Sequence, residues 1–249
     1  MPRSVWAALL AATASSSALK SNATSAWRAA NPAFRVVDSY QRVFAQRSAA
    51  HRARLGAGAP CHFLDVGGRY GESRRLAGGC AYWIVDVNRV TSARERVLGC
   101  DIEAWGSCRG AAHGGGALPR FDVLHSQNTF EHLRMPWEAL RTMGGLARRG
   151  ALLLLAAPFA WRYHAVQVPA RDGASAGGSY GDYLRYTADE LAFLAERFGN
   201  FSALESGYDE RQRRTNQRGT LPSRTDGVRE DALGGWLESI EAFYVGQKR

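Results

Sequence analysis

Three aspartates stand along the chain at places where a nucleoside-binding protein needs acidic side chains. Asp65, Asp86 and Asp101 each lie within or just after a short apolar run. In an open α/β sheet, ligands bind beyond the carboxyl ends of the strands. A carboxylate at such a position can accept hydrogen bonds from both hydroxyls of a ribose, and we assign this role to Asp86. A second carboxylate can accept from the exocyclic amine of adenine, and we assign this role to Asp101. Each aspartate alone is equally typical of a helix N-cap, but three in succession favour a nucleoside ligand.

A glycine-rich turn follows the first of these apolar runs. Asp65 and Val66 lead into Gly67, Gly68 and Gly71. Glycines permit a tight turn and let backbone N–H groups approach a ligand closely. This spacing lacks the G-x-G-x-x-G pattern of a pyrophosphate-binding turn. The turn is therefore a weak signal on its own, and it gains weight only from the aspartates that follow.

Histidines supply the candidate acid–base groups. His132, His164 and His125 all fall near the predicted ligand mouth, and an imidazole can accept a proton from an acceptor hydroxyl or ammonium group. For His132 the alternative is structural, because Glu131 and His132 can cap and brace the start of the next helix, and we rank this alternative above catalysis. No metal site is expected from the spacing of histidines and cysteines.

Alternating strand and helix patterns must position these residues. Short apolar runs indicate strands, and apolar residues at 3.6-residue spacing indicate helices, so recurring βαβ units predict a parallel sheet. Cations and a glycine at Arg148–Gly150 are expected to close the helix before them, and Thr187 is expected to open another. The predicted strands are His62–Val66, Ala81–Val87, Val97–Asp101, Phe121–His125, Ala151–Ala157, Phe201–Tyr208 and Ile240–Val245, and the helices are Phe34–Leu55, Gly71–Leu76, Trp137–Ala147 and one that starts at Thr187.

At this point the chain resembles the class I S-adenosylmethionine-dependent methyltransferases of the small-molecule and glycan-modifying type. Phe63–Gly67 (FLDVG) resembles the first motif of that family, and Phe121–Leu133 (FDVLHSQNTFEHL) resembles its fourth-strand segment. The resemblance continues through Asp182–Thr187 (DYLRYT) and covers roughly residues 61–200. One residue departs from the pattern: Arg69 takes the place of the middle glycine of the first loop, which we interpret as a loop variant.

The resemblance implies a fold and a set of site residues. The fold would be a Rossmann-like α/β fold, with a mostly parallel central sheet, helices on both faces and an antiparallel C-terminal strand. Residues expected to bind S-adenosyl-L-methionine are Asp65, Gly67, Gly68, Tyr70, Gly71, Asp86, Val87, Asp101, Ile102, Ser126 and Gln127. A lid near residues 159–186 would carry Tyr183, Arg185 and Tyr186 toward the acceptor, although an arginine that braces a loop is as common as one that binds an anion.

The resulting hypothesis is methyl transfer from S-adenosylmethionine to an oxygen or nitrogen of a small molecule or glycan. Two alternatives stay open. A nicotinamide-dependent oxidoreductase uses the same type of ribose-binding acid, but it needs the phosphate-binding turn that is missing here. A methyltransferase-like binding protein without cofactor is suggested by Arg69.

The composition limits the number of domains and the kinds of binding partner that we expect. The 249 residues suffice for one sizeable core. Of the 32 basic residues, eight lie in residues 1–56 against one acid, which leaves 24 basic against 22 acidic residues in the remainder. The body is therefore nearly neutral, and no nucleic-acid partner is expected. We divide the chain into a targeting segment at 1–30, a helical region at 31–60 and the methyltransferase domain at 61–249.

The N-terminal segment indicates the cellular compartment of the protein. Arg3 precedes an apolar run over residues 5–12 and a serine- and alanine-rich stretch, which is typical of a cleavable signal. That run is too short for a membrane span, so no stable membrane insertion is expected. The secretory pathway is favoured, with a plastid or mitochondrial transit peptide as the alternative. Sequons at Asn22 and Asn200 are usable only in the first case.

Four cysteines, Cys61, Cys80, Cys100 and Cys108, show no CxxC pairing. We expect buried thiols, which are common near the starts of strands. Disulfides between Cys61 and Cys80 or between Cys100 and Cys108 are the alternative in an oxidising compartment.

Overall fold

The computed structural model describes residues 33–37, 39–56, 58–68, 71, 73–89, 91–92, 94–105, 118–159, 166–167, 179–209 and 241–249. The predicted targeting segment lies outside these residues. The strands are β1 (Phe34–Val37), β2 (His62–Val66), β3 (Ala81–Val85), β4 (Val97–Leu98), β5 (Phe121–Gln127), β6 (Ala147–Pro158), β7 (Val166–Gln167), β8 (Ser179–Tyr180), β9 (Phe201–Asp209) and β10 (Glu241–Lys248). The helices are α2 (Tyr40–Leu55), α3 (Arg74–Ala77), α5 (Pro136–Leu146) and α6 (Ala188–Gly199), with short 3-10 helices η1 (Ile102–Ala104) and η3 (Phe130–His132).

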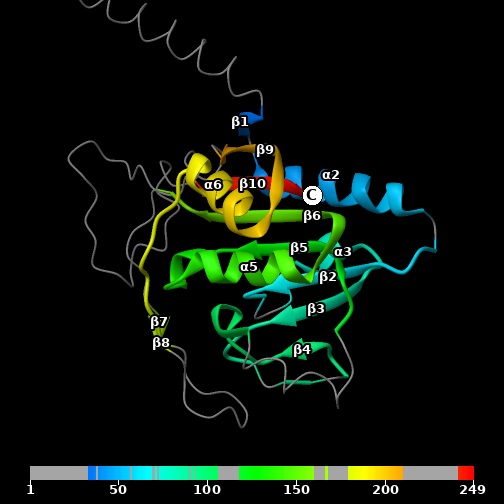
Figure 1. Ribbon diagram of the computed structural model, residues 1–249, viewed down its shortest axis with the longest axis horizontal. Helices are drawn as coiled ribbons and strands as arrows, with labels where there is room; N and C mark the ends of the chain where they lie inside the picture. Colours follow the sequence, from blue (N-terminus) through cyan, green and yellow to red (C-terminus); the bar gives the residue numbers. More distant parts are fainter. Residues whose placement is uncertain are drawn as a thin grey trace, which may run out of the picture.

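Eight strands form one mixed sheet in the order β1-β9-β10-β6-β5-β2-β3-β4 (Figure 1). Strands β4, β3, β2, β5 and β6 pair in parallel, whereas β10 pairs antiparallel with both β6 and β9. Without β1, this is the seven-strand order and the antiparallel last strand of the class I methyltransferase fold. The order reverses between β2 and β5, because β3 and β4 extend the sheet to one side of β2 and β5 begins the other side. The predicted fold class is confirmed.

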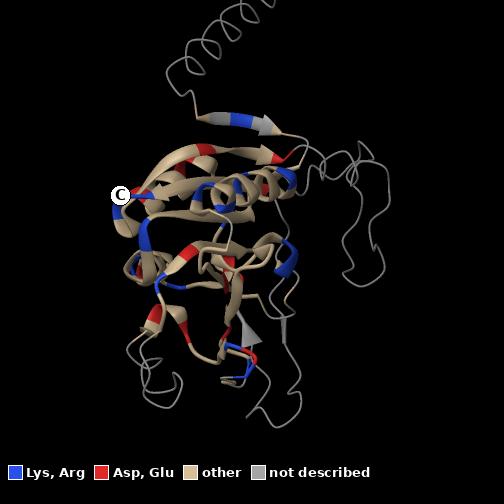
Figure 2. Cartoon of the chain, turned by 90° about the vertical axis from the view of Figure 1, so that its right-hand side faces the viewer, with Lys and Arg blue, Asp and Glu red and all other residues tan. Residues whose placement is uncertain are grey.

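The two faces of the sheet bury separate cores (Figure 1). In β6, Leu153 and Leu155 pack on the face covered by α5 and α6, and Leu152 and Leu154 pack on the face covered by α2 and α3. Side chains alternate along a strand, so a continuous apolar run fills both faces. Figure 2 shows most of the sheet free of charged residues, with a basic stretch within β1 as an exception and many of the other charges on helices and connections.

Helix ends follow the expected signals at α6. Thr187 accepts a hydrogen bond from the backbone N–H of Glu190 at 3.0 Å, as an N-cap does. Asn200 ends the helix in the left-handed region, with φ of 57°, where asparagine is tolerated better than most residues. The predicted helix that starts at Thr187 is confirmed.

Three element predictions need correction. Phe34–Val37 is not the first turn of a helix but strand β1, which pairs in parallel with β9; a free sheet edge outweighs the helical spacing of its apolar residues. Arg148–Gly150 does not close α5, because the helix ends at Leu146 and these residues already belong to β6. Gly150 lies there at φ of 80°, beside a register shift against β5. The predicted helix over Gly71–Leu76 is shortened to Arg74–Ala77.

A disulfide joins Cys61 to Cys80, with their Cα atoms 4.6 Å apart. These cysteines directly precede β2 and β3, whose first residues His62 and Ala81 are register partners. Cys100 is disulfide-bonded as well, and Cys108 lies outside the described residues. The expectation of buried thiols is therefore wrong for Cys61, Cys80 and Cys100. No helix in the described part of the chain is long and apolar enough to cross a membrane.

Candidate functional site

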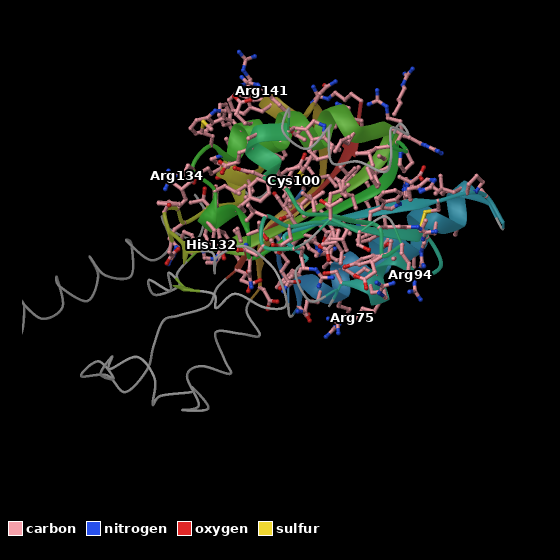
Figure 3. All side chains as sticks on the ribbon, turned by 90° about the horizontal axis from the view of Figure 1, so that it is seen from below. Arg75, Arg94, Cys100, His132, Arg134 and Arg141 are labelled. Carbon is pink, nitrogen blue, oxygen red and sulfur yellow. A yellow bond between two sulfur atoms is a disulfide. The ribbon has the colours of Figure 1, made fainter. Side chains whose placement is uncertain are left out.

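A cavity of about 460 Å³ opens at the carboxyl ends of β2, β3 and β5, where the strand order reverses. Such a volume falls in the range of small-molecule sites. Its lining combines apolar side chains with a few polar ones: Val66, Gly67, Val85, Asp86, Val87, Cys100, Asp101, Ile102, Glu103, Asn128, Thr129, His132, Leu133, Arg134, Gly181 and Tyr183. Figure 3 shows His132 and Arg134 on the same side of the molecule, with Cys100 farther toward its centre.

Two of the three predicted aspartates border this cavity. Asp86 directly follows β3, and its Oδ1 accepts hydrogen bonds from the backbone N–H of Asn88 at 2.7 Å and from the Asn88 amide at 3.4 Å. Asp101 caps η1 by accepting from the backbone N–H of Glu103 at 2.8 Å. Each carboxylate is thus held in place by its own loop. Asp101 both caps a short helix and lines the cavity, so the two interpretations of this residue are compatible.

Asp65 does not line the cavity, which corrects the prediction for this residue. It lies within β2 on the side of Phe63, toward α2 and α3, and is 1% exposed. Its Oδ1 lies 2.8 Å from Nδ1 of His125, and its Oδ2 accepts a hydrogen bond from the hydroxyl of Tyr82. Asp65 is therefore a buried structural acid beneath the turn that follows β2.

The turn after β2 requires glycine at two positions. Gly67 lines the cavity at φ of 77°, and a Cβ there would meet the Thr129 hydroxyl oxygen at 2.0 Å. A Cβ on Gly68 would meet the Asp65 carboxylate at 2.1 Å. Gly68 and Gly71 do not line the cavity, although both were predicted to contact the cofactor. Tyr70 and Arg69 lie outside the described residues.

The cavity residues at the end of β5 were predicted two positions too early. Ser126 is buried and donates to the carbonyl of Val66 at 3.0 Å, and neither Ser126 nor Gln127 lines the cavity. Their places are taken by Asn128 and Thr129. Asn128 has a φ of 50°, a conformation that asparagine tolerates better than most residues. An asparagine and a threonine directly after a buried strand were the sequence signal for these two positions.

His132 lines the cavity and also braces it. Its Nδ1 donates to the carbonyl of Gly181 at 2.7 Å, since a carbonyl can only accept. Its Nε2 lies 3.6 Å from a carboxylate oxygen of the buried Glu131. Both ring nitrogens thus face protein groups. The predicted capping of the next helix by Glu131 and His132 is wrong, because the N-cap of α5 is Met135 and no side chain caps it. His125 is fully buried and not at the cavity mouth, and His164 lies outside the described residues.

The predicted acceptor residues separate into three environments. Tyr183 lines the cavity and is 47% exposed. Arg185 donates to Asp182 at 2.7 Å and to the carbonyl of Leu184 at 2.7 Å, so it braces its own segment and does not line the cavity. Tyr186 is fully buried, donates to the carbonyl of Phe130 at 3.0 Å, and has its pKa raised by burial. Arg185 and Tyr186 are therefore corrected to structural residues.

Glu103 and Arg134 also line the cavity and were missed by the sequence analysis. Glu103 accepts from the backbone N–H of Met135. Arg134 donates to the Tyr183 hydroxyl at 3.1 Å, with its guanidinium 5.5 Å from the centre of that ring. Because the backbone N–H of Tyr183 donates to the carbonyl of Glu131 at 2.8 Å, residues 181–184 are tied to the segment after β5 along one wall of the cavity.

Comparison with solved structures finds proteins of this fold at low similarity. A 1,6-didemethyltoxoflavin methyltransferase from Burkholderia thailandensis, bound to S-adenosylhomocysteine, is 17% identical with a TM-score of 0.47, over 100% of this chain and 91% of that one. The magnesium protoporphyrin IX methyltransferase of Synechocystis, bound to S-adenosylmethionine, is 12% identical with a TM-score of 0.44, over 84% and 79%. No protein-family model and no curated protein matches the sequence. The fold assignment rests on the strand order and directions of the sheet.

Proposed function

We propose that the chain transfers a methyl group from S-adenosylmethionine to an oxygen or nitrogen atom of a small molecule or glycan. The observation that carries this proposal is that Asp86 and Asp101 border one cavity, at the point where the sheet order reverses. In open α/β sheets this point is where ligands bind.

The lining fits an adenosine group. In this proposal, Asp86 accepts hydrogen bonds from the ribose hydroxyls and Asp101 accepts one from the adenine amine. Val87 and Ile102 flank these acids on the same wall and offer apolar surface for a base. Gly67 lets the backbone approach the ligand closely where a side chain would collide with Thr129. Of the predicted cofactor residues, these five are the ones we retain.

The other wall would face the acceptor. S-adenosylmethionine supplies an electrophilic methyl group on a sulfonium, so the protein mainly orients two reactants and excludes water. Tyr183 and Arg134 form a polar pair at this wall, and His132 holds it to Gly181. We assign His132 a positioning role before a role as base. A hydroxyl- or amine-bearing acceptor would then meet the phenol and the guanidinium.

The test is calorimetry with S-adenosylhomocysteine on the purified chain and on Asp86→Ala. We expect saturable 1:1 binding by the parent. The variant should bind about 100-fold more weakly, because the hydroxyls of a bound ribose would lose a charged acceptor, which corresponds to about 2.7 kcal/mol.

A matched control is Asp189→Ala, which removes an exposed acid in the first turn of α6 that does not line the cavity. It should bind S-adenosylhomocysteine within about twofold of the parent. Full affinity in a folded Asp86→Ala variant would overturn the proposal. Binding of NAD in place of S-adenosylhomocysteine would favour the oxidoreductase alternative.

We further propose that the chain works in the secretory pathway. The Cys61–Cys80 disulfide supports an oxidising compartment, and Asn200 of the sequon Asn200–Ser202 is exposed. Mass spectrometry of protein from its natural source would test this proposal. We expect cleavage within the first 30 residues and a glycan on Asn200, and an unmodified full-length chain would argue against secretion.

A further inference from the structure

A second cavity, of about 450 Å³, is lined by four arginines and a single acid. It lies beside β3 and β4, where Tyr82 and Ile84 from β3 and Val97 from β4 form its floor. The arginines come from α3 and from the connection between the two strands. They are Arg74, Arg89, Arg94 and Arg96, and the acid is Glu95.

This cavity and the candidate cofactor site use opposite faces of the same strands. Val85 faces the α5 and α6 side and lines the first cavity, whereas Tyr82 and Ile84 face the α2 and α3 side. Figure 3 shows the labelled Arg94 and Arg75 on one side of the molecule and the labelled His132 and Arg134 on the other. A ligand in the arginine cavity therefore does not occupy the methyl-transfer site.

Backbone hydrogen bonds hold the described residues just before β4 in place. Ser92 and Val97 form an isolated antiparallel bridge with two hydrogen bonds of 2.9 Å. The carbonyl of Arg96 accepts from the N–H of Ile84 at 2.9 Å, which fixes this residue against β3. Arg96 adopts a φ of 56°, a costly conformation for a side chain of this size. These bonds fix the backbone of Ser92, Arg96 and Val97 beside β3, so the Arg96 side chain starts from a fixed position.

Positive charge in the cavity exceeds negative charge by three. Arg89 pairs with Glu95 at 3.3 Å, which offsets one arginine. Among the described residues, no carboxylate lies within salt-bridge distance of Arg74, Arg94 or Arg96, and all three are exposed. The guanidinium carbon of Arg74 instead lies over the Tyr82 ring, 4.6 Å from the ring centre, which is a cation–π contact and not an ion pair.

Guanidinium groups gathered around a concave floor are the chemistry of oxyanion recognition, since their planar N–H pairs match the oxygens of phosphate or sulfate. We propose that this cavity binds a small oxyanion, either free phosphate or sulfate or the same group carried on a small molecule. Arg74, Arg94 and Arg96 supply the donors, and Tyr82 with Ile84 closes the floor. The cavity is about as large as the candidate cofactor site, so it also accommodates the carrier of such a group.

The test is calorimetric titration of the full chain with inorganic phosphate and, separately, with sulfate, up to about 10 mM and with chloride used to match the ionic strength. We expect saturable 1:1 binding of at least one ion. The double variant Arg94→Gln/Arg96→Gln should lower that affinity about tenfold, through loss of two charge-assisted contacts. The variant should bind S-adenosylhomocysteine like the parent, which separates this site from the proposed function.

A matched control removes the same charge elsewhere. Arg141→Gln/Arg197→Gln, on α5 and α6, should leave phosphate and sulfate affinity within about twofold. Should the double variant at the cavity fail to fold, Arg94→Gln alone, at an exposed position, should still lower the affinity about threefold. Equal loss in both double variants, or no saturable binding by the parent, would overturn the proposal. Binding of heparin without binding of either ion would also overturn it, in favour of a polyanion surface.

Discussion

The carboxyl ends of β2 and β3 lie side by side, and each carries an aspartate with different surroundings. Val66 and Val85 are register partners, with Asp65 just before the first and Asp86 just after the second. Asp65 is 1% exposed and Asp86 is 6% exposed, so burial hardly separates them. Their partners do: Asp65 contacts the side chains of Tyr82 and His125 from neighbouring strands, whereas Asp86 contacts its own loop and lines the cavity.

Asp65 and Asp86 face different surroundings because they occupy different positions relative to the ends of their strands. Side chains on a strand alternate between faces, so a residue inside β2 on the side of Phe63 turns away from the cavity. Asp86 lies beyond the last residue of β3, where the backbone leaves the sheet and the residue lines the cavity. One acid therefore contacts its neighbours within the sheet, and the other lines the cavity.

The largest expected effect is on stability, at Asp65. We predict that Asp65→Ala lowers the free energy of unfolding by about 4 kcal/mol, because it leaves the Tyr82 hydroxyl and His125 Nδ1 buried without their acceptor. Urea unfolding followed by circular dichroism measures this change. Asp86→Ala, the matched variant on the next strand, should change stability by less than about 1 kcal/mol.

Equal losses at both positions would contradict this distinction. A strongly destabilised Asp86→Ala would mean that Asp86 also stabilises the fold, and a stable Asp65→Ala would mean that the contacts of Asp65 contribute little. Intact mass and the disulfide state should be checked for each variant, since loss of the Cys61–Cys80 bond next to β2 and β3 would lower stability for another reason.

Alternation explains which parts of the site the sequence could reveal. The strands and the positions of Asp86 and Asp101 were predictable because buried parallel strands are continuous apolar runs and acids at their ends are conspicuous. The structural role of Asp65 follows from its side of β2, but that side is known only once its partners from β3 and β5 are in place. Conversely, the sequence pattern predicts a helix at Phe34–Val37, but these residues form a strand because they pair with the edge strand β9.

The sequence could not reveal the missed cavity residues either, because their position also depends on how distant segments pack together. Glu103 and Arg134 lie far apart in the sequence and line one cavity because the segments after β4 and β5 meet at the same end of the sheet. Arg185 and Tyr186 follow Tyr183 directly, yet only Tyr183 lines the cavity. An irregular segment has no period from which the direction of each side chain can be inferred.

The second prediction concerns Glu241, a third acid at this end of the sheet, opposite Pro158 at the end of β6. Burial raises its pKa to about 7, from an ordinary value of 4.5, even though the side chains of Tyr40 and Asn128 favour the charged form. Between these two pH values the folded chain keeps a proton that the unfolded chain has released. Stability should therefore fall as the pH rises through this window, by about 3 kcal/mol in total, and stay level for this group above it.

Glu241→Gln isolates this contribution, because the amide keeps the shape and does not titrate. The difference in unfolding free energy between parent and variant should shift steadily in favour of the variant from about pH 4.5 to 7, when both are measured in urea at each pH. Other titrating groups cancel in that difference. A difference that stays constant with pH would contradict the raised pKa. The comparison is between two buried acids. Burial disfavours the charged form of Glu241, whereas the carboxylate of Asp65 has two side-chain partners.

The smallest effect should come from Tyr82→Phe, which removes one partner of Asp65 and keeps the acid. The ring stays in place to stack on Phe63, at 5.6 Å between centroids, and under Arg74, so only the hydroxyl is lost. We predict a loss of about 2 kcal/mol in unfolding free energy, with S-adenosylhomocysteine affinity within about twofold of the parent. Combined with Asp65→Ala, the two losses should fall short of their sum by about 1.5 kcal/mol, because the second change deletes a contact that the first has already broken. Strict additivity would mean that the hydroxyl and the carboxylate do not stabilise each other, and the buried acid of β2 would then depend on His125.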